Sequence, residues 1–290
     1  MRTLYWICTV AFLSICGMFA FTVEGVPLGT GALVWADEFN GNSLDATRWS
    51  VNQPGRWGDA MNTPAAVSVD GGSLKITAYT DPSSGRHYSA VVGTQDHYLP
   101  TFGYFESRIK FNDAPGEWSA FWIQSPANAN NFSTTPAPGT EVDVAEHRVV
   151  DESGTNISGQ VNSALHWDGY GPSAKYQQSL SNPMAGMANN TWHTYGLLWT
   201  PLEYTFYLDG QAIWTSTTAL SSTPEFLLLS SLVQNNTWAG NIPSGGYGPL
   251  EASTTGMAVD YVHVFALPEP GMMGLAAGLV LMLRRRVRGD

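Results

Sequence analysis

The 290-residue chain has only two cysteines, Cys8 and Cys16, and both lie in an apolar N-terminal stretch. The rest of the sequence therefore has no disulfide and no Cys/His cluster of the kind that binds structural zinc. No helical period is sustained, and no repeat of solenoid length is visible. These absences exclude a disulfide scaffold, a zinc module and a helical solenoid, so the fold must be stabilised by burial alone.

Basic side chains are also scarce. Lys and Arg number 13 against 24 Asp and Glu, a net charge of −11, and five of the 13 are Arg2, Arg284, Arg285, Arg286 and Arg288. The remaining eight face 21 acids between Val26 and Leu267, which gives that region a net charge of 8 − 21 = −13. A domain of this charge repels nucleic acid and can hardly hold a polyanion, so we expect no nucleic-acid partner.

The first 25 residues resemble a secretory signal, with Arg2 before an apolar run from Leu4 to Phe21. An uncleaved anchor and a lipoprotein site at Cys16 are the alternatives. Residues 267–290 hold Pro-Glu-Pro, an apolar run too short to span a bilayer comfortably, and a final arginine cluster. This arrangement resembles the PEP-CTERM sorting signal, which implies an exosortase-type protease as partner and export to the cell envelope or the extracellular space. An ordinary tail anchor is the alternative.

Between these segments, residues 26–266 are predicted to form one all-β domain. The composition is rich in aromatics, Gly and Pro, and short strand patterns are separated by polar turns. Strands are expected at 74–79, 104–111, 192–199, 204–208, 211–214, 226–233 and 257–265, and Asp209-Gly210 predicts a hairpin turn. Strands at this spacing indicate a two-sheet antiparallel sandwich, and Ser125–Gly139 reads as a long loop at the rim of a cleft.

The sequence Glu141-Val142-Asp143-Val144-Ala145-Glu146 predicts a strand with unusual chemistry. Alternation puts Glu141 and Asp143 on one face, but it would turn Glu146 into the apolar layer. A β-bulge between Asp143 and Glu146 would bring the third acid back to its companions. Because adjacent carboxylates repel one another, stability does not explain the set. An exposed acidic strand is the plain interpretation, and a catalytic carboxylate set is the sharper one.

Seven segments, taken in order, resemble glycoside hydrolase family 16. They are Val34–Phe39 with Leu44, Asp45 and Trp49; Phe102–Arg108; Gly116–Trp122; Glu141–Glu146; Trp192–Gly196; Tyr207–Gly210; and Val259–Val262. The E-x-D-x-x-E spacing is similar to that of the bulged branch, with its laminarinases and agarases. The resemblance implies a jelly-roll sandwich of the concanavalin A-like lectin/glucanase type and a retaining hydrolase.

The same resemblance implies roles for the acids. Glu141 would be the nucleophile and Glu146 the acid/base, the two carboxyl groups that a retaining glycosidase requires. Asp143, between them, would interact with the nucleophile and help to keep Glu146 protonated, since like charges raise the pKa of a neighbour.

Sugar rings need aromatic platforms with polar partners. We expect substrate contacts from six residues, each of which has a structural role as its alternative: Trp118, Trp122, His166, Asn235, Asn236 and Trp238. The hydrolytic chemistry requires no cofactor. The resemblance suggests a structural Ca²⁺ at positions corresponding to Glu38, Gly72 and Asp260, and oxygen ligands suit calcium.

The sequence thus predicts an exported, monomeric, endo-acting β-glycanase with a polysaccharide substrate. The scarcity of Lys and Arg favours a neutral β-1,3- or mixed-linkage glucan. A β-galactanase of the agarase or porphyranase type, a non-catalytic lectin and a transglycosylase are the alternatives.

Overall fold

The structure, a computed structural model, describes residues 31–51, 56–179 and 190–267. The predicted signal segment and nearly all of the predicted sorting segment therefore lie outside the described residues. Within the described part, no helix is both long and apolar enough to cross a membrane.

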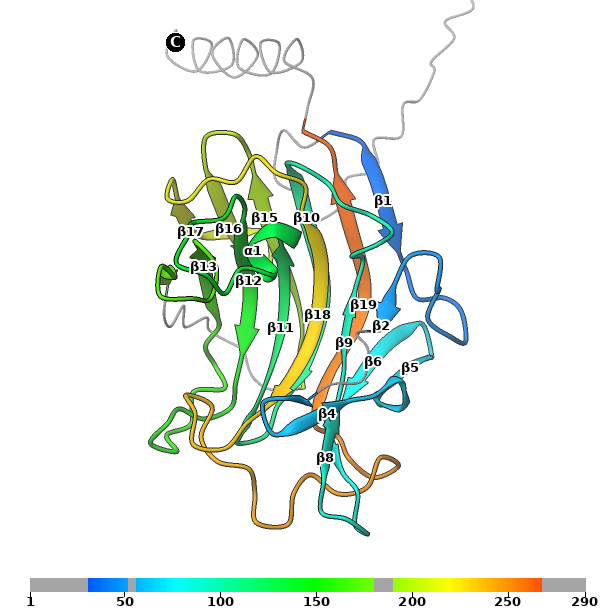
Figure 1. Ribbon diagram of the computed structural model, residues 1–290. Helices are drawn as coiled ribbons and strands as arrows, with labels where there is room; N and C mark the ends of the chain where they lie inside the picture. The colour runs from blue at the N-terminus through cyan, green and yellow to red at the C-terminus, as the bar shows by residue number, and fades with distance from the viewer. Residues whose placement is uncertain (1–30, 52–55, 180–189, 268–290) are drawn as a thin grey trace, which may run out of the picture.

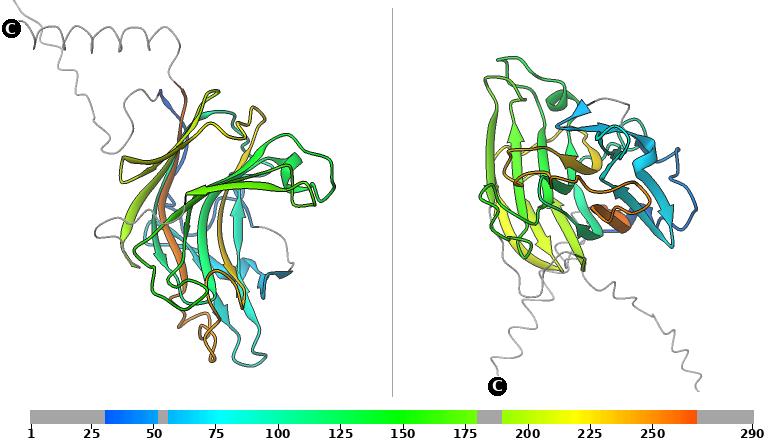
Figure 2. Two further views of the ribbon diagram at one scale, coloured as in Figure 1. Left: turned by 90° about the vertical axis from the view of Figure 1, so that its left-hand side faces the viewer. Right: turned by 90° about the horizontal axis from the view of Figure 1, so that it is seen from below.

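Two large antiparallel sheets pack face to face, as the sequence predicts (Figures 1 and 2). The eight-stranded sheet contains, in spatial order, β17 (Gln211–Ser216), β16 (Tyr204–Leu208), β15 (Trp192–Trp199), β10 (Gly103–Asn112), β19 (Gly256–Phe265), β6 (Ser73–Thr77) and β5 (Val67–Asp70), and β1 (Leu33–Asp37) also pairs with β19. The seven-stranded sheet contains β14 (Lys175–Ser179), β13 (Asn162–Trp167), β12 (Thr140–His147), β11 (Glu117–Gln124), β18 (Phe226–Val233), β9 (Val91–Gly93) and β2 (Ser50–Val51).

A small third sheet flanks the sandwich, and two short helical segments complete the described elements. The sheet contains β3 (Arg56–Trp57), β4 (Ala60–Asn62), β8 (His87–Ser89) and β7 (Tyr79–Thr80). The helical segments are a 3₁₀ turn at Pro64–Ala66 and α1 at Pro126–Ala129. The third sheet was not predicted, because strands of two or three residues are too short to show a period of two.

Alternation along the seven-stranded sheet separates the core from a second, functional face. On β11, Phe121 and Ile123 are fully buried in the main core cluster, and on β18 Leu227 and Leu229 join them. The intervening residues of both strands point to the opposite face, where a cleft lies. The strand predicted at 226–233 is confirmed as β18, and every one of its residues is buried.

Turn chemistry positions the connections as predicted. Asp209 and Gly210 have φ of 48° and 73°, the pair of positive values that a tight hairpin needs, and they join β16 to β17. The long segment Ser125–Gly139 begins with the single helical turn α1, which the sequence analysis did not predict. Pro126 at the first helical position favours this turn because its fixed φ suits a helix start.

The bulge in β12 lies where the sequence predicts it. Against β13, Asp143 pairs with Ala164 and Glu146 pairs with Asn162, so three steps on β12 match two on β13. The register against β11 also shifts, with Phe121 opposite Ala145 and Trp122 opposite Asp143. Val144 and Ala145 are both buried in the core cluster, and Glu146 is thereby returned to the cleft face.

Candidate active site

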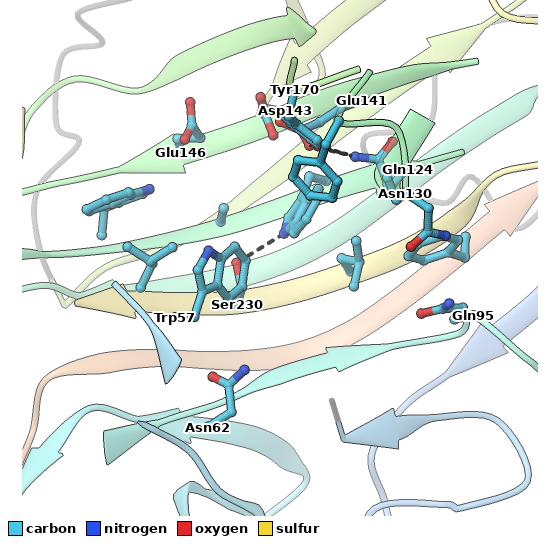
Figure 3. A pocket seen from close by; sticks show the side chains of 18 residues that line it. Trp57, Asn62, Gln95, Gln124, Asn130, Glu141, Asp143, Glu146, Tyr170 and Ser230 are labelled. Atoms are coloured by element: carbon cyan, nitrogen blue, oxygen red, sulfur yellow. Dashed lines mark hydrogen bonds between the residues drawn. The ribbon is translucent and has the colours of Figure 1, made fainter. Parts of the chain in front are cut away.

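A cleft of about 740 Å³ crosses the exposed face of the seven-stranded sheet. Glu141, Asp143 and Glu146 line it together, which confirms the predicted common face of the three acids. Figure 3 shows the acids along one strand, with Trp57, Asn62 and Gln95 across the pocket. The cleft is therefore built by β12 and β11 on one side and by the small sheet and the β9 end on the other.

Glu141 is held by two donors. Gln124 Nε2 donates to its Oε2 at 2.7 Å, and the Tyr170 hydroxyl donates to the same oxygen. Burial raises the pKa of Glu141 to about 8, and the Asp143 charge adds to this, while His166 and the Tyr170 hydrogen bond act in the opposite direction. The two donors thus favour the ionised form of Glu141 and oppose the effect of burial, although the pKa stays above its ordinary value.

Asp143 and Glu146 lack such donors among the described residues. Burial raises the pKa of Asp143 to about 7. The pKa of Glu146 lies well above its ordinary value, because the side chain is buried and because Asp143 is negative. The pKa values of both glutamates are therefore raised, but only Glu141 accepts hydrogen bonds that favour its ionised form. This difference in environment is of the kind that separates a nucleophile from an acid/base group at a glycosidic bond.

Aromatic side chains form the floor and one wall of the cleft. Trp118 and Trp122 both line it, and they come from the face of β11 opposite to Phe121. The Trp122 ring lies 6.1 Å from that of Trp57, and its Nε1 donates to Ser230 at 3.0 Å. The two tryptophans are therefore placed as a sugar platform requires. Their contact with substrate remains a prediction.

His166 lies beside the acids but at the nucleophile end of the set. Its Nε2 is 3.4 Å from Asp143 Oδ2 and 4.0 Å from Glu141 Oε1. The pairing of His166 with Glu141 across β13 and β12 fixes it next to Glu141. Together with Glu141 and Asp143 it forms a group of potential metal ligands among the described residues.

Asn235 and Asn236 lie outside the set of described residues that line the cleft. The Asn235 backbone N–H donates to Asp59, its side-chain oxygen accepts from Ile242, and the Asn236 N–H donates to Asn241. Because β18 ends at Val233, the chain turns away from the cleft and these groups organise a loop. The structure thus gives no support to their expected substrate contacts.

Trp238 supports the cleft without lining it. Its ring meets Trp118 edge-on at 5.7 Å, and the Arg148 guanidinium lies 4.1 Å from the centre of the Trp238 ring. We infer that Trp238 fixes the orientation of the Trp118 ring by packing against it.

The sequence analysis missed Tyr170, Gln124 and Trp57, which all line the cleft. Gln124 could have been found from the strand period, because it continues the alternation of Trp118 and Trp122. Tyr170 and Trp57 reach the cleft only through loop and sheet contacts between distant segments, and no local pattern reveals them.

Two of the three suggested calcium positions carry basic partners. The Asp260 carboxylate accepts from Arg108 at 2.6 Å, and the Glu38 carboxylate lies 2.6 Å from His263 Nε2. Gly72 occupies the turn between β5 and β6 with a positive φ. Because the Asp260 carboxylate is already paired with Arg108, these residues fit the ion poorly, and the calcium site remains a prediction.

Known proteins match this chain over its described domain. It is 28% identical over 257 residues to a β-glucanase of Rhodothermus marinus, an alignment covering 82% of this chain and 86% of that protein. It is 27% identical over 272 residues to the glucan endo-1,3-β-glucosidase A1 of Niallia circulans, covering 80% of this chain but only 37% of that protein.

Among solved structures, porphyranase B from Zobellia galactanivorans superposes with a TM-score of 0.63 at 20% identity, covering 81% of this chain and 91% of that one. The model of the β-porphyranase A–D GH16 domain matches residues 34–267. This chain therefore belongs to glycoside hydrolase family 16.

Proposed function

We propose that this chain cleaves a neutral β-1,3- or mixed-linkage β-1,3/1,4-glucan at internal bonds, with retention of configuration. The observation that carries the proposal is the arrangement of Glu141 and Glu146 on one face of an open cleft, where hydrogen bonds that favour the ionised form reach Glu141 and not Glu146 among the described residues. An open cleft accepts a chain that continues in both directions, as endo cleavage requires.

In the proposed first step, the Glu141 carboxylate attacks the anomeric carbon while Glu146 gives its proton to the departing oxygen. The bond from carbon to that oxygen breaks as the bond to Glu141 forms. In the second step, water attacks the same carbon, its proton passes to Glu146, and the bond to Glu141 breaks. No cofactor takes part. Asp143, 3.4 Å from His166 Nε2, helps to hold the proton on Glu146 through its charge.

The lining of the cleft supports a neutral substrate. Of the described residues that line it, none is Lys or Arg, and three are acids. Recognition of a sulfate ester would require cationic or other strong donors. The relatives named as β-glucanase and endo-1,3-β-glucosidase agree with a glucan.

A β-galactanase is the second candidate. The family model that matches residues 34–267 describes porphyranase domains, and a keratan-sulfate endo-1,4-β-galactosidase of Sphingobacterium multivorum is 28% identical over 253 residues. Within this class, the acidic cleft favours a neutral galactan such as agarose.

The test is release of reducing ends from laminarin, lichenan, agarose, porphyran and carrageenan by wild type, Glu141→Gln and Glu146→Gln. We expect wild type to be most active on a glucan, with losses of at least roughly 10²–10⁴-fold in the two variants and a smaller loss in Asp143→Asn. Equal release by wild type and both variants on every polysaccharide would favour the lectin alternative. Longer products in place of hydrolysis products would indicate transglycosylation.

We also propose that the protein is exported, with residues 1–25 removed and residues 267–290 recognised by an exosortase-type protease. The sequence patterns alone support this. Fractionation of cells that produce the full chain, compared with a variant in which Arg284, Arg285 and Arg286 are replaced by Ser, tests it. An unchanged distribution would contradict the C-terminal part of the proposal.

A further inference from the structure

The two oxygens of the Glu141 carboxylate have different surroundings. Oε2 accepts from Gln124 Nε2 at 2.7 Å and from the Tyr170 hydroxyl. His166 Nε2 lies 4.0 Å from Oε1, a distance that is too long for a hydrogen bond. Figure 3 shows Gln124 and Tyr170 next to Glu141. Oε1 is therefore the oxygen left available for a reacting group.

The direction of the Tyr170 hydrogen bond follows from its other partner. Gln124 Nε2 also donates to the Tyr170 oxygen. Because an amide nitrogen can only donate, the tyrosine oxygen accepts there and its own proton points toward Glu141. Burial, together with the neighbouring Glu141 charge, raises the pKa of Tyr170, so the hydroxyl keeps this proton throughout the working pH range.

Tyr170 is placed by a loop that is built onto a second loop. The Gly169 N–H donates to Asn128 Oδ1 at 2.7 Å, and the Tyr170 N–H donates to the Asn131 carbonyl at 2.8 Å. A Cβ at Gly169 would lie 2.3 Å from that carbonyl oxygen, and φ there is +81°, so only glycine permits this approach. Lys175 adds an ion pair of 2.7 Å with Asp168. The tyrosine position is thus fixed by several independent contacts.

We propose that Tyr170 is a positioning residue for the nucleophile: with Gln124 it holds Oε2 of Glu141 and leaves Oε1 to bond to the anomeric carbon. This inference rests on the proposed function. In the first step the bond between Oε1 and carbon forms as the bond to the departing oxygen breaks, and Glu146 supplies the proton. In the second step water replaces Oε1, the proton of water goes to Glu146, and the negative charge returns to Glu141.

The hydrogen bonds to Oε2 change in strength during this cycle. They are strong when Glu141 is a carboxylate and weaker when it is an ester, since hydrogen bonds to charged acceptors are roughly twice as strong. Tyr170 therefore assists the second step, in which the carboxylate is regenerated. It also favours the ionised form of free Glu141, because its hydrogen bond lowers the pKa of that group.

The test compares Tyr170→Phe with Tyr176→Phe in the full chain on the preferred polysaccharide. Tyr176 lies close by on β14, is 66% exposed, and stacks on His166 through its ring, which Phe retains. We expect Tyr170→Phe to lower kcat/KM by roughly 10–100-fold below neutral pH, the effect of a lost hydrogen bond to a charged group. The loss should shrink as pH rises, because the acid limb of the profile moves to higher pH. The control should follow wild type.

A loss of equal size at every pH would overturn the inference, since it would indicate a plain substrate contact, and so would an unchanged profile. A direct readout separates this inference from the proposed function: the ¹³C signal of the Glu141 carboxyl carbon, assigned by its absence in Glu141→Gln. Tyr170→Phe should raise its titration midpoint. If the midpoint moves but wild type cuts no polysaccharide, only the proposed function fails. If it does not move, the inference fails whatever the activity.

Discussion

Two features keep a proton on Glu146: burial, and the negative charge of Asp143, three residues earlier across the bulge. The opposite influence of the Arg148 charge is smaller. Glu141, only five residues earlier on the same strand, accepts two hydrogen bonds that favour its ionised form. Both pKa values are raised, but the two residues of the same type have different local contacts, which is the basis for assigning them different roles.

A second buried carboxyl pair lies behind the acidic strand. Asp113 and Glu117 are hydrogen-bonded to each other and fully buried, and Glu117 Oε1 also accepts from Ser119 at 2.8 Å and from Ser231. Asp113 in turn pairs with His147, the residue after Glu146. Burial raises the pKa of both carboxyl groups well above the ordinary range. A proton on one of the two carboxyl groups accounts for the hydrogen bond that joins them.

This pair should make stability depend on pH. Because its folded-state pKa values are raised, the folded state binds more protons than the unfolded state, and the free energy of unfolding falls as pH rises above about 4.3. Glu117→Gln removes one titration and keeps an acceptor for the two serines. We therefore expect the Tm of the variant minus the Tm of wild type to increase from pH 4.5 to pH 8. Each kcal/mol of difference in the free energy of unfolding corresponds to roughly 2–4 °C in Tm.

Thermal melts across this pH range measure the effect, and Glu152→Gln, which changes an exposed loop residue, is the matched control. The Tm difference between Glu152→Gln and wild type should not change with pH. A Tm difference for Glu117→Gln that falls with rising pH would mean that Glu117 is ionised in the folded protein.

At the scale of a single element, β12 supplies side chains both to the core and to the cleft, in an order that strict alternation does not allow. Val142, Val144 and Ala145 belong to the core, while Glu141, Asp143 and Glu146 line the cleft. Two consecutive core residues followed by a cleft residue are possible only because the strand bulges between Asp143 and Glu146. The size of the bulged residue matters, because Ala145 is fully buried opposite Phe121.

Ala145→Leu tests this link between packing and the acid/base residue. Overpacking a filled core costs about 1–3 kcal/mol, which corresponds to a fall in Tm of roughly 2–12 °C for a domain of this size. Because the strand must shift to admit the larger side chain, we also expect kcat to fall while the KM changes less. Ala212→Leu on the exposed side of β17 is the control. A lowered Tm with unchanged kcat would show that the bulge does not position Glu146.

The bulge, the two-sheet sandwich and the tryptophans of β11 could be predicted from the sequence because each depends on a local pattern. Alternation assigns faces within a strand, and a failure of alternation at Glu146 reveals the bulge. Tyr170 was missed because its position depends on contacts between two loops about 40 residues apart. Asn235 and Asn236 lie outside the residues that line the cleft, and no sequence pattern showed that the chain turns away after β18.

At the scale of the whole molecule, the apolar core and the acidic cleft lie on opposite faces of the seven-stranded sheet. The main core lies between the two large sheets, and the cleft lies on the far face of the seven-stranded sheet. The region 26–267 carries a net charge of −13 from 21 acids and eight basic residues, and three of those acids are concentrated in the cleft. Such a field favours uncharged ligands and opposes anionic ones as they approach.

The response to salt should therefore distinguish the two candidate substrates. Raising NaCl from about 0.1 M to about 1 M shortens the Debye length from about 10 Å to about 3 Å, which screens the charge of the cleft. For a neutral glucan we expect kcat/KM to change by less than about two-fold, because no long-range charge interaction is lost or gained. For a sulfated galactan we expect a low value that rises with salt, as repulsion is screened. Reducing-end assays on laminarin and porphyran at both concentrations measure this, with agarose as the uncharged control for the galactan backbone. A kcat/KM on porphyran that exceeds that on laminarin and falls with salt would reveal cationic contacts and would overturn the assignment of a neutral substrate.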